Sequence, residues 1–310
     1  MTLAELVEAA SHQMDAAGLA FGHGTSNARD EAAWLVLWAL NLPLDTELEQ
    51  AGDQVLAPDA CARAEALVTQ RIQTRQPAAY LTGEAWLQGV PFWVDRRVIV
   101  PRSFIAELIT QAEGADSLDH WLGTHTHKVL DLCTGNGSLA VLAAMAWPEV
   151  HVDAADISED ALAVARRNVE RHGLQNRIRL LQSDGWHNLP GRYDLVLCNP
   201  PYVSRVGMKN LPPEYLAEPA ISLDGGLQGG TDGMDFVRHL LDHALVHLNE
   251  GGVLVLEIGN EREHFEHAFP TLLADWLDTT SGPGPVLLLT HEALLDWQQT
   301  RDLPTPGDHP

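Results

Sequence analysis

Residues 128–137 read KVLDLCTGNG, an apolar run followed by a loop with two glycines. The apolar run predicts a strand over 128–133, and the apolar residues 137–147 predict the helix that follows it. The same reading predicts strands over 151–156, 178–182, 193–198, 252–258 and 286–290, and helices over 158–172 and 235–248. Short apolar strands that alternate with helices indicate a parallel sheet covered on both faces.

The residues before this α/β pattern have a different character. Apolar residues recur at helical spacing up to about residue 75, and residues 85–102 are rich in aromatic and β-branched residues, which predicts a hairpin. We therefore expect a helical domain over 1–80, a hairpin linker over 81–103 and an α/β domain over 104–310, with a loose, proline-rich tail from about 301 to 310.

The chain of 310 residues carries 19 Lys and Arg against 43 Asp and Glu, a formal charge of −24. Residues 1–103 contribute 7 − 13 = −6 and residues 104–310 contribute 12 − 30 = −18. Such a surface repels phosphate backbones and anionic membranes. The charge argues against nucleic-acid and membrane partners, and it is compatible with a basic protein or a small molecule.

Cysteine use and the N-terminus indicate a cytoplasmic protein. The cysteines at 61, 133 and 198 are too few for a disulfide framework. Glu5 and Glu8 stand where a signal peptide would be positive, and no apolar run approaches the roughly 20 residues of a membrane span. Three histidines at 120, 125 and 127 lie close together, but nothing nearby completes a metal site, so we expect none.

The loop from Asp131 to Gly137 is the first candidate site. Small residues after a parallel strand let backbone N–H groups approach a ligand, which suits a nucleotide-type cofactor. The spacing is not GxGxxG, because Ser138 and Leu139 follow Gly137, and this weakens a dinucleotide interpretation. An ordinary strand–helix turn remains the alternative.

Two acidic residues follow later strands. Asp156 lies 19 residues after Gly137, where a carboxylate can accept from ribose hydroxyls, although it could instead cap the helix that begins near Ser158. Asp184 could accept from an adenine amino group and the following Trp186 could cover the ring, or Asp184 could be a simple turn residue.

The sharpest motif is Asn199-Pro200-Pro201-Tyr202, directly after the predicted strand over 193–198. The prolines fix the backbone and lack N–H groups, so their carbonyls face no donor of their own. Together with the Asn199 side chain, such a corner can accept both hydrogens of a planar NH2 group, on which Tyr202 can pack. A plain proline loop is the alternative.

Together these motifs resemble the S-adenosylmethionine-dependent methyltransferases, in which NPPY marks enzymes that methylate amide or amino nitrogens. The resemblance extends to the HemK-like protein-glutamine methyltransferases over nearly the whole chain. It is carried by QPAAYLTGE at 76–84, Phe92, VPRS at 100–103, EP at 218–219, LDGG at 223–226, TDG at 231–233 and LEIGN at 256–260.

Within this family the chain is most similar to the PrmB branch, which methylates a glutamine of large-subunit ribosomal protein L-three. That branch has the patterns LDxCTGxG and PRSxIxELI, which are present here, and LTHEAL at 289–294 is also similar to it. The other branch methylates the GGQ glutamine of release factors. It usually carries glycine where this chain has Cys133, and PRPETE where this chain has PRSFIA at 101–106.

The resemblance implies a Rossmann-like class I methyltransferase sheet, S-adenosylmethionine as cofactor with S-adenosylhomocysteine as product, and a helical domain that recognises substrate. The implied substrate is a basic protein, free L-three before assembly, with no direct nucleic-acid or membrane binding; the oligomeric state stays open. The implied catalytic residues are Asn199, Pro200, Pro201 and Tyr202. The implied cofactor-binding residues are Asp131, Cys133, Thr134, Gly135, Asn136, Gly137, Asp156, Ile157, Asp184, Gly185, Trp186 and Asn199.

In that family's release-factor branch a tryptophan directly follows the third acidic residue. Here Gly185 fills that slot and Trp186 comes next, so either could line the adenine. The alternatives are methylation of release factors, a nucleic-acid amino-methyltransferase, a nicotinamide-dependent oxidoreductase and a non-catalytic binding module. The charge opposes the nucleic-acid enzyme, and the missing GxGxxG opposes the oxidoreductase.

Overall fold

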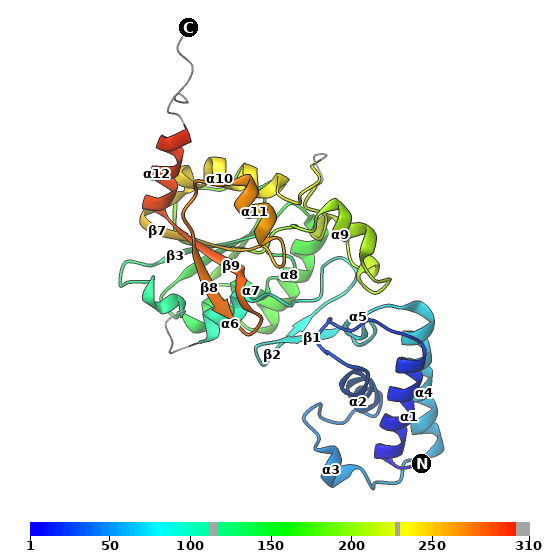
Figure 1. Cartoon of the computed structure of the whole chain (residues 1–310). Coiled ribbons are helices and arrows are strands. Elements are labelled where there is room, and N and C mark those ends of the chain that lie inside the picture. Colours follow the sequence, from blue (N-terminus) through cyan, green and yellow to red (C-terminus); the bar gives the residue numbers. More distant parts are fainter. Residues whose placement is uncertain (112–116, 227–229, 302–310) are drawn as a thin grey trace. The chain divides into compact units, whose positions relative to one another are not determined.

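The computed structural model describes residues 1–111, 117–226 and 230–301. The predicted loose tail, apart from residue 301, lies outside the described residues. The chain forms two compact units (Figure 1). The N-terminal unit comprises Met1–Arg102 and Leu211–Pro219, and the sheet unit comprises Ser103–Asn210 and Ala220–Pro310. The short segment Leu211–Pro219 thus belongs with residues far before it in the sequence.

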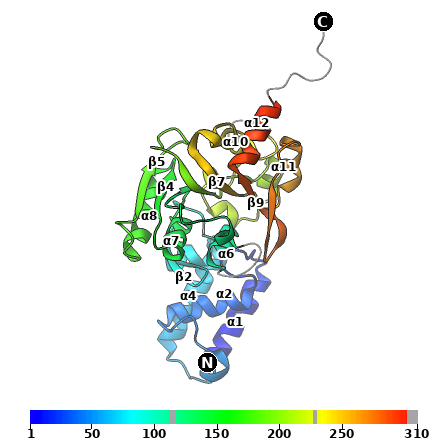
Figure 2. The same cartoon turned by 90° about the vertical axis from the view of Figure 1, so that its left-hand side faces the viewer.

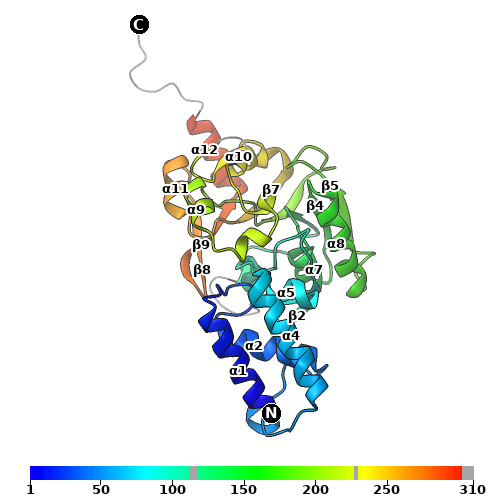
Figure 3. The ribbon, with the colours of Figure 1, turned by 90° about the vertical axis from the view of Figure 1, so that its right-hand side faces the viewer.

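The N-terminal unit is helical, as expected. Its main helices are α1 (Leu3–Ala16), α2 (Ala28–Ala39) and α4 (Pro58–Thr74), accompanied by the short helices α3 (Leu48–Ala51) and α5 (Ala78–Thr82) (Figures 1 and 3). The helices enclose an apolar core. A capping box between Thr2 and Glu5 begins α1, and the Asn27 side chain caps α2. These local signals lie at the positions where the helices begin.

The predicted hairpin is confirmed over a shorter range. Strands β1 (Glu84–Leu87) and β2 (Val90–Trp93) pair antiparallel, and Gln88 and Gly89 between them both have positive φ, at 50° and 73°. Two such residues form the tight turn whose twist matches the flanking strands.

Segment Leu211–Pro219 joins the N-terminal unit through buried charges. Glu214 accepts from the Ala20 N–H at 3.1 Å and pairs with Arg75 at 2.9 Å. Glu218 accepts two hydrogen bonds from the Arg102 guanidinium, both at 2.6 Å, and a third from the Val100 N–H at 2.8 Å. Charged groups removed from water need such partners, so these bonds determine where the segment lies.

The sheet unit contains a seven-stranded sheet with the order β5-β4-β3-β6-β7-β9-β8. The strands are β3 (Lys128–Leu132), β4 (His151–Asp156), β5 (Ile178–Gln182), β6 (Tyr193–Cys198), β7 (Leu248–Glu257), β8 (Asp275–Thr279) and β9 (Gly282–Thr290). The first five in this order run parallel, which confirms the Rossmann-like fold.

The expectation of a wholly parallel sheet is wrong at one edge. Strand β9 runs antiparallel to both β7 and β8. The sequence pattern missed β8 because among its residues only Leu277 is buried, as befits a short strand at the edge of a sheet.

Helices cover both faces of the sheet. Helices α6 (Ile105–Thr110), α7 (Ser138–Ala146) and α8 (Glu159–Arg171) lie on one face, and α10 (Asp235–His247) and α12 (His291–Arg301) on the other (Figures 1 and 2). The remaining short elements are α9 (Arg205–Asn210), α11 (Arg262–Ala268) and the 3₁₀ turns Leu118–His120, Tyr215–Ala217 and Ala220–Ser222, of which Tyr215–Ala217 is part of the N-terminal unit. In the part of the chain that is described, no helix is long and apolar enough to cross a membrane.

Candidate active site

The predicted site residues follow strands that are neighbours and point the same way. Leu132 at the end of β3 is in register with Ala155 of β4 and with Cys198 of β6, and Cys198 is in register with Leu256 of β7. The loops that follow these strands therefore emerge together at the carboxyl ends of the parallel strands. In sheets of this type, ligands bind outside these carboxyl ends, at the point where the strand order reverses direction.

The loop after β3 turns sharply into helix α7. Cys133, Gly135 and Gly137 have φ of 64°, 55° and 81°, a conformation that glycine adopts without strain. A Cβ on Gly137 would lie 3.1 Å from Ala165 of α8, so this glycine allows the loop and the helix to approach closely. A Cβ on Gly135 would meet no atom within 4 Å, which leaves open space beside the loop.

Asp131 is buried at the base of this loop. Its Oδ2 accepts from the Thr134 hydroxyl at 2.5 Å and from the Ala140 N–H at 2.9 Å, whereas its buried Oδ1 has no partner among the described residues. Burial, together with the nearby Asp156 charge, raises the pKa of Asp131 to about 7 despite these hydrogen bonds. An unpartnered carboxylate oxygen is suited to a cationic ligand.

Asp156 lies at the end of β4, beside the same loop. Its carboxylate accepts from the Gly135 N–H and from the Ser158 N–H, both at 2.9 Å, and burial raises its pKa. Ser158 caps α8 itself by accepting from the Ala161 N–H at 3.1 Å. Asp156 therefore does not cap the helix through its side chain. The neighbouring Ile157 is exposed and offers an apolar surface next to it.

The three residues after β5 differ in exposure. Asp184 is exposed, and Gly185 is buried with φ of 53°, where a Cβ would lie 3.2 Å from His239. The Ser183 N–H donates to the Asp156 carbonyl at 3.0 Å, which holds this turn beside the end of β4.

Trp186 does not lie where an adenine ring could stack. The residue is only 4% exposed, its indole N–H donates to the Leu240 carbonyl at 3.0 Å, and its ring stacks on His247 with centroids 4.7 Å apart. The interpretation of Trp186 as an adenine-covering residue is therefore corrected: Trp186 is a core residue under α10. Its buried indole N–H needs an acceptor, and the Leu240 carbonyl provides it.

Asn199 follows β6 and is half-buried. Its side chain forms no hydrogen bond with any other described residue, so both its oxygen and its nitrogen remain available. The preceding Cys198 thiol is adjacent to that of Cys133, and this contact and burial raise the pKa of Cys133. Both cysteines are free thiols, and each lies at the start of one of the two motif loops.

Glycines from two other motifs support the NPPY loop. A Cβ on Gly259 would lie 2.7 Å from the Tyr202 ring, and one on Gly233 would lie 2.1 Å from the Tyr202 carbonyl. The Val203 N–H donates to the Leu223 carbonyl at 2.8 Å, and the Val203 carbonyl accepts from the Gly225 N–H at 3.1 Å. The sequence contained these two glycines in the TDG and LEIGN motifs, but the close contacts that require them are visible only in three dimensions.

A buried glutamate links two further motifs. Glu257, 2% exposed at the end of β7, accepts from the Ser103 hydroxyl at 2.5 Å and from the Phe104 N–H at 2.8 Å. The serine of PRS and the start of α6 are thus bound to the strand end that carries LEIGN. Among the described residues, no group of three or more His, Cys, Asp and Glu side chains could hold a metal ion.

The site thus combines an open, glycine-containing loop, an unpartnered buried carboxylate oxygen and an asparagine free to bind an amide. Comparison with known proteins matches residues 113–220 to the methyltransferase small domain and residues 5–83 to the PrmC N-terminal domain. The ribosomal protein uL3 glutamine methyltransferase of Bordetella pertussis is 50% identical over 296 residues, which cover 94% of this chain and 96% of that protein.

The chain belongs to the ribosomal protein uL3 glutamine methyltransferases. The member from Burkholderia pseudomallei is 48% identical over 93% of this chain and 94% of that protein. The member from Neisseria meningitidis serogroup B is 45% identical over 95% of this chain and 94% of that protein. These matches confirm the predicted family and the class I methyltransferase fold. They also confirm S-adenosylmethionine as the cofactor.

S-Adenosylmethionine fits the residues present. It carries a positive sulfonium and an ammonium, which suit the unpartnered Oδ1 of Asp131, and the open side of Gly135 leaves room beside the loop.

Proposed function

We propose that this chain transfers a methyl group from S-adenosylmethionine to the side-chain amide nitrogen of a glutamine in ribosomal protein uL3. The observation that carries the proposal is the 50% identity to a uL3 glutamine methyltransferase over 96% of its length. The free Asn199 side chain after β6 supplies a group that can select an amide.

The main task of the chain's own residues is to position the glutamine. An amide nitrogen is a weak nucleophile because its lone pair is delocalised into the carbonyl. Asn199 Oδ1 and the Pro200 carbonyl accept the two amide hydrogens, which directs the nitrogen towards the methyl donor and stabilises the positive charge that develops on it. Such orientation is worth roughly 7–11 kcal/mol of the barrier.

Tyr202 packs on the planar amide, and its ring is held by Gly259. No strong base is required before transfer, because the surplus proton on the nitrogen leaves afterwards.

The cofactor supplies an electrophilic methyl group when bound. Asp131 and the loop Thr134–Gly137 hold its methionine end, with Cys133 and Asn136 in the wall of the site. Asp156 accepts from the ribose hydroxyls, and Ile157 contacts the adenine. Asp184 accepts from the adenine amino group and Gly185 keeps that turn compact.

We further propose that the helical N-terminal unit recognises uL3 and that uL3 is bound before it assembles with RNA, in the cytoplasm. The formal charge of −24 favours a basic protein over a phosphate backbone. Trp38 of α2 is 41% exposed and offers the unit an apolar contact for a protein. Substrate binding should therefore weaken as salt is raised.

The proposal is tested with labelled S-adenosylmethionine and purified uL3, release factor and ribosomal RNA in parallel reactions. We expect label in uL3 alone, and a Gln→Ala variant of the modified residue in uL3 should abolish it. Label in release factor alone would move the chain to the other branch, and label in RNA would contradict the charge argument.

A further inference from the structure

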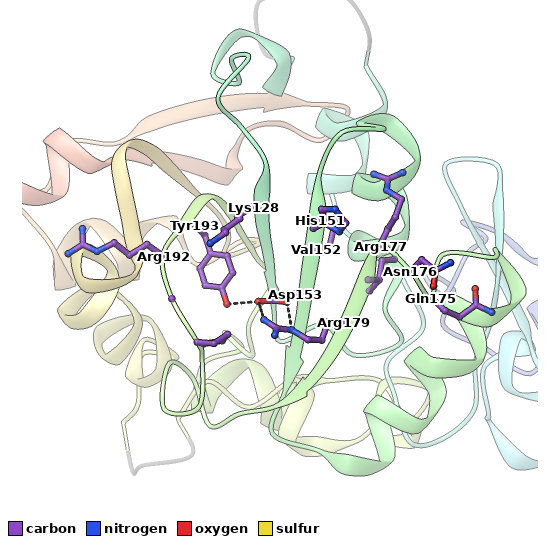
Figure 4. Close-up of a pocket in the computed structure, with 13 residues that line it drawn as sticks. Lys128, His151, Val152, Asp153, Gln175, Asn176, Arg177, Arg179, Arg192 and Tyr193 are labelled. Carbon is purple, nitrogen blue, oxygen red and sulfur yellow. Dashed lines mark hydrogen bonds and ion pairs between the residues drawn. The ribbon is translucent and has the colours of Figure 1, made fainter.

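A cavity lies at the amino ends of strands β3, β4, β5 and β6, away from the loops of the candidate active site. It has a volume of about 420 Å³, and its lining includes Lys128 of β3, His151 of β4, Arg179 of β5 and Tyr193 of β6 (Figure 4). The cofactor loops follow the other ends of the same strands. Because a five-residue strand spans about 16 Å, this cavity is separate from the methyl-transfer site.

The charge of the cavity is opposite to that of the protein. Four of the 12 Lys and Arg residues of 104–310 line it, against one carboxylate, that of Asp153. The four are Lys128, Arg177, Arg179 and Arg192. The lining therefore has a formal charge of 4 − 1 = +3 in a chain whose net charge is −24.

Two of these cationic side chains, Arg177 and Arg179, are bound to neighbouring elements of the sheet unit. Arg177 donates to the carbonyls of Ala144 at 2.7 Å and of Trp147 at 2.6 Å, which ties β5 to the end of α7. Arg179 binds both carboxylate oxygens of Asp153, at 2.8 and 2.7 Å. The Tyr193 hydroxyl also donates to Asp153, at 2.9 Å, so the one carboxylate is fully occupied (Figure 4).

The other two cations are not neutralised. The Lys128 side chain is exposed and has no partner among the described residues, and its register neighbour on β4 is His151, which adds no negative charge. Arg192 uses one nitrogen, Nη1, to donate to the Leu248 carbonyl at 3.1 Å, and its other donors remain open. Asp153 cannot serve them, because it is engaged by Arg179 and Tyr193.

We propose that this cavity is a binding site for a small phosphate-bearing anion of the diphosphate or nucleotide class. A volume of about 420 Å³ is in the range of small-molecule sites. Guanidinium and ammonium donors are the groups that bind phosphate oxygens. The exposed amides of Gln175 and Asn176 in the lining can bind the rest of such a molecule. A polynucleotide would need a track of cations, whereas these are confined to one cavity.

The test is calorimetry of the full chain with pyrophosphate and with ATP, in the presence of saturating S-adenosylhomocysteine so that the adenosine site is filled. We expect binding that weakens at least tenfold in the double variant Lys128→Gln/Arg192→Gln. The matched control is Arg29→Gln/Arg63→Gln, which removes the same charge from exposed positions of α2 and α4 and should change affinity less than twofold.

Binding of both ligands assigns the site to the diphosphate group, and binding of ATP alone assigns it to a nucleotide. Absence of binding by either, or an equal loss in both double variants, would overturn the proposal. An RNA oligomer that binds more tightly than ATP and loses affinity in the Lys128→Gln/Arg192→Gln variant would also overturn it, in favour of a nucleic-acid surface.

Discussion

Replacement of Glu218 by glutamine should destabilise the N-terminal unit by about 3 kcal/mol at neutral pH. Glu218 is fully buried as a side chain and accepts from Arg102 and from the Val100 N–H, with His23 Nε2 at 3.5 Å. Burial alone would raise its pKa, but His23 and Arg102 outweigh burial and lower the pKa from 4.5 to about 2. A difference of this size between folded and unfolded chains corresponds to about 3 kcal/mol.

The direction of the pKa shift of Glu218 determines how its contribution to stability changes with pH. A carboxyl group whose pKa is lowered by folding stabilises the protein fully above its unfolded pKa, and this contribution is lost as the pH falls towards the folded pKa. With pKa values of 4.5 unfolded and about 2 folded, about 2 kcal/mol of the contribution should be lost by pH 3. Glu218→Gln has no such carboxyl group, so its deficit relative to the wild type should shrink over this range.

The assay is urea unfolding of the full chain at pH 7 and at pH 3, followed by far-ultraviolet circular dichroism. The matched control is Glu8→Gln, which removes an exposed glutamate of α1 and should change stability by less than about 0.5 kcal/mol; among the described residues its side chain pairs with His12, at 3.2 Å. A cost below about 1 kcal/mol for Glu218→Gln at pH 7, or a deficit that stays constant down to pH 3, would refute the reasoning.

Three further predictions concern the active site. Asn199→Ala should lower methyl transfer to uL3 by about 10²–10³-fold while cofactor affinity, measured by calorimetry, stays within about twofold, because the lost oxygen contacts the amide; normal turnover would exclude the assigned role. Because the pKa of Asp131 is raised to about 7, cofactor affinity should rise about fivefold from pH 6 to pH 7 as the carboxyl group ionises, and Asp131→Asn should remove this dependence; a flat wild-type profile would contradict it. Gly259→Ala should lower the rate at least about tenfold through the 2.7 Å contact with Tyr202, whereas Gly251→Ala, also at positive φ but with nothing within 4 Å, should not; equal effects would point to backbone strain alone.

The alternation of apolar strands and helices predicted most of the sheet unit, because strands buried on both faces leave a continuous apolar run. Strand β8, helix α12 and the short helices were not predicted; β8 was missed because an edge strand with one buried residue carries no such run. The predicted site residues follow strands that the structure makes neighbours, and Trp186 is the residue that the structure places elsewhere.

The sequence by itself determined the fold class, the motif loops and the family, because each depends on residues that are close together in the chain. Only the tertiary structure decided that Trp186 is a core residue, that Gly233 and Gly259 hold the NPPY loop, and that Leu211–Pro219 belongs to the N-terminal unit. The physical reason is that these properties depend on partners distant in sequence. An indole donor, a missing Cβ and a buried carboxylate each need a specific neighbour, and the neighbour is brought there by the packing of the whole chain.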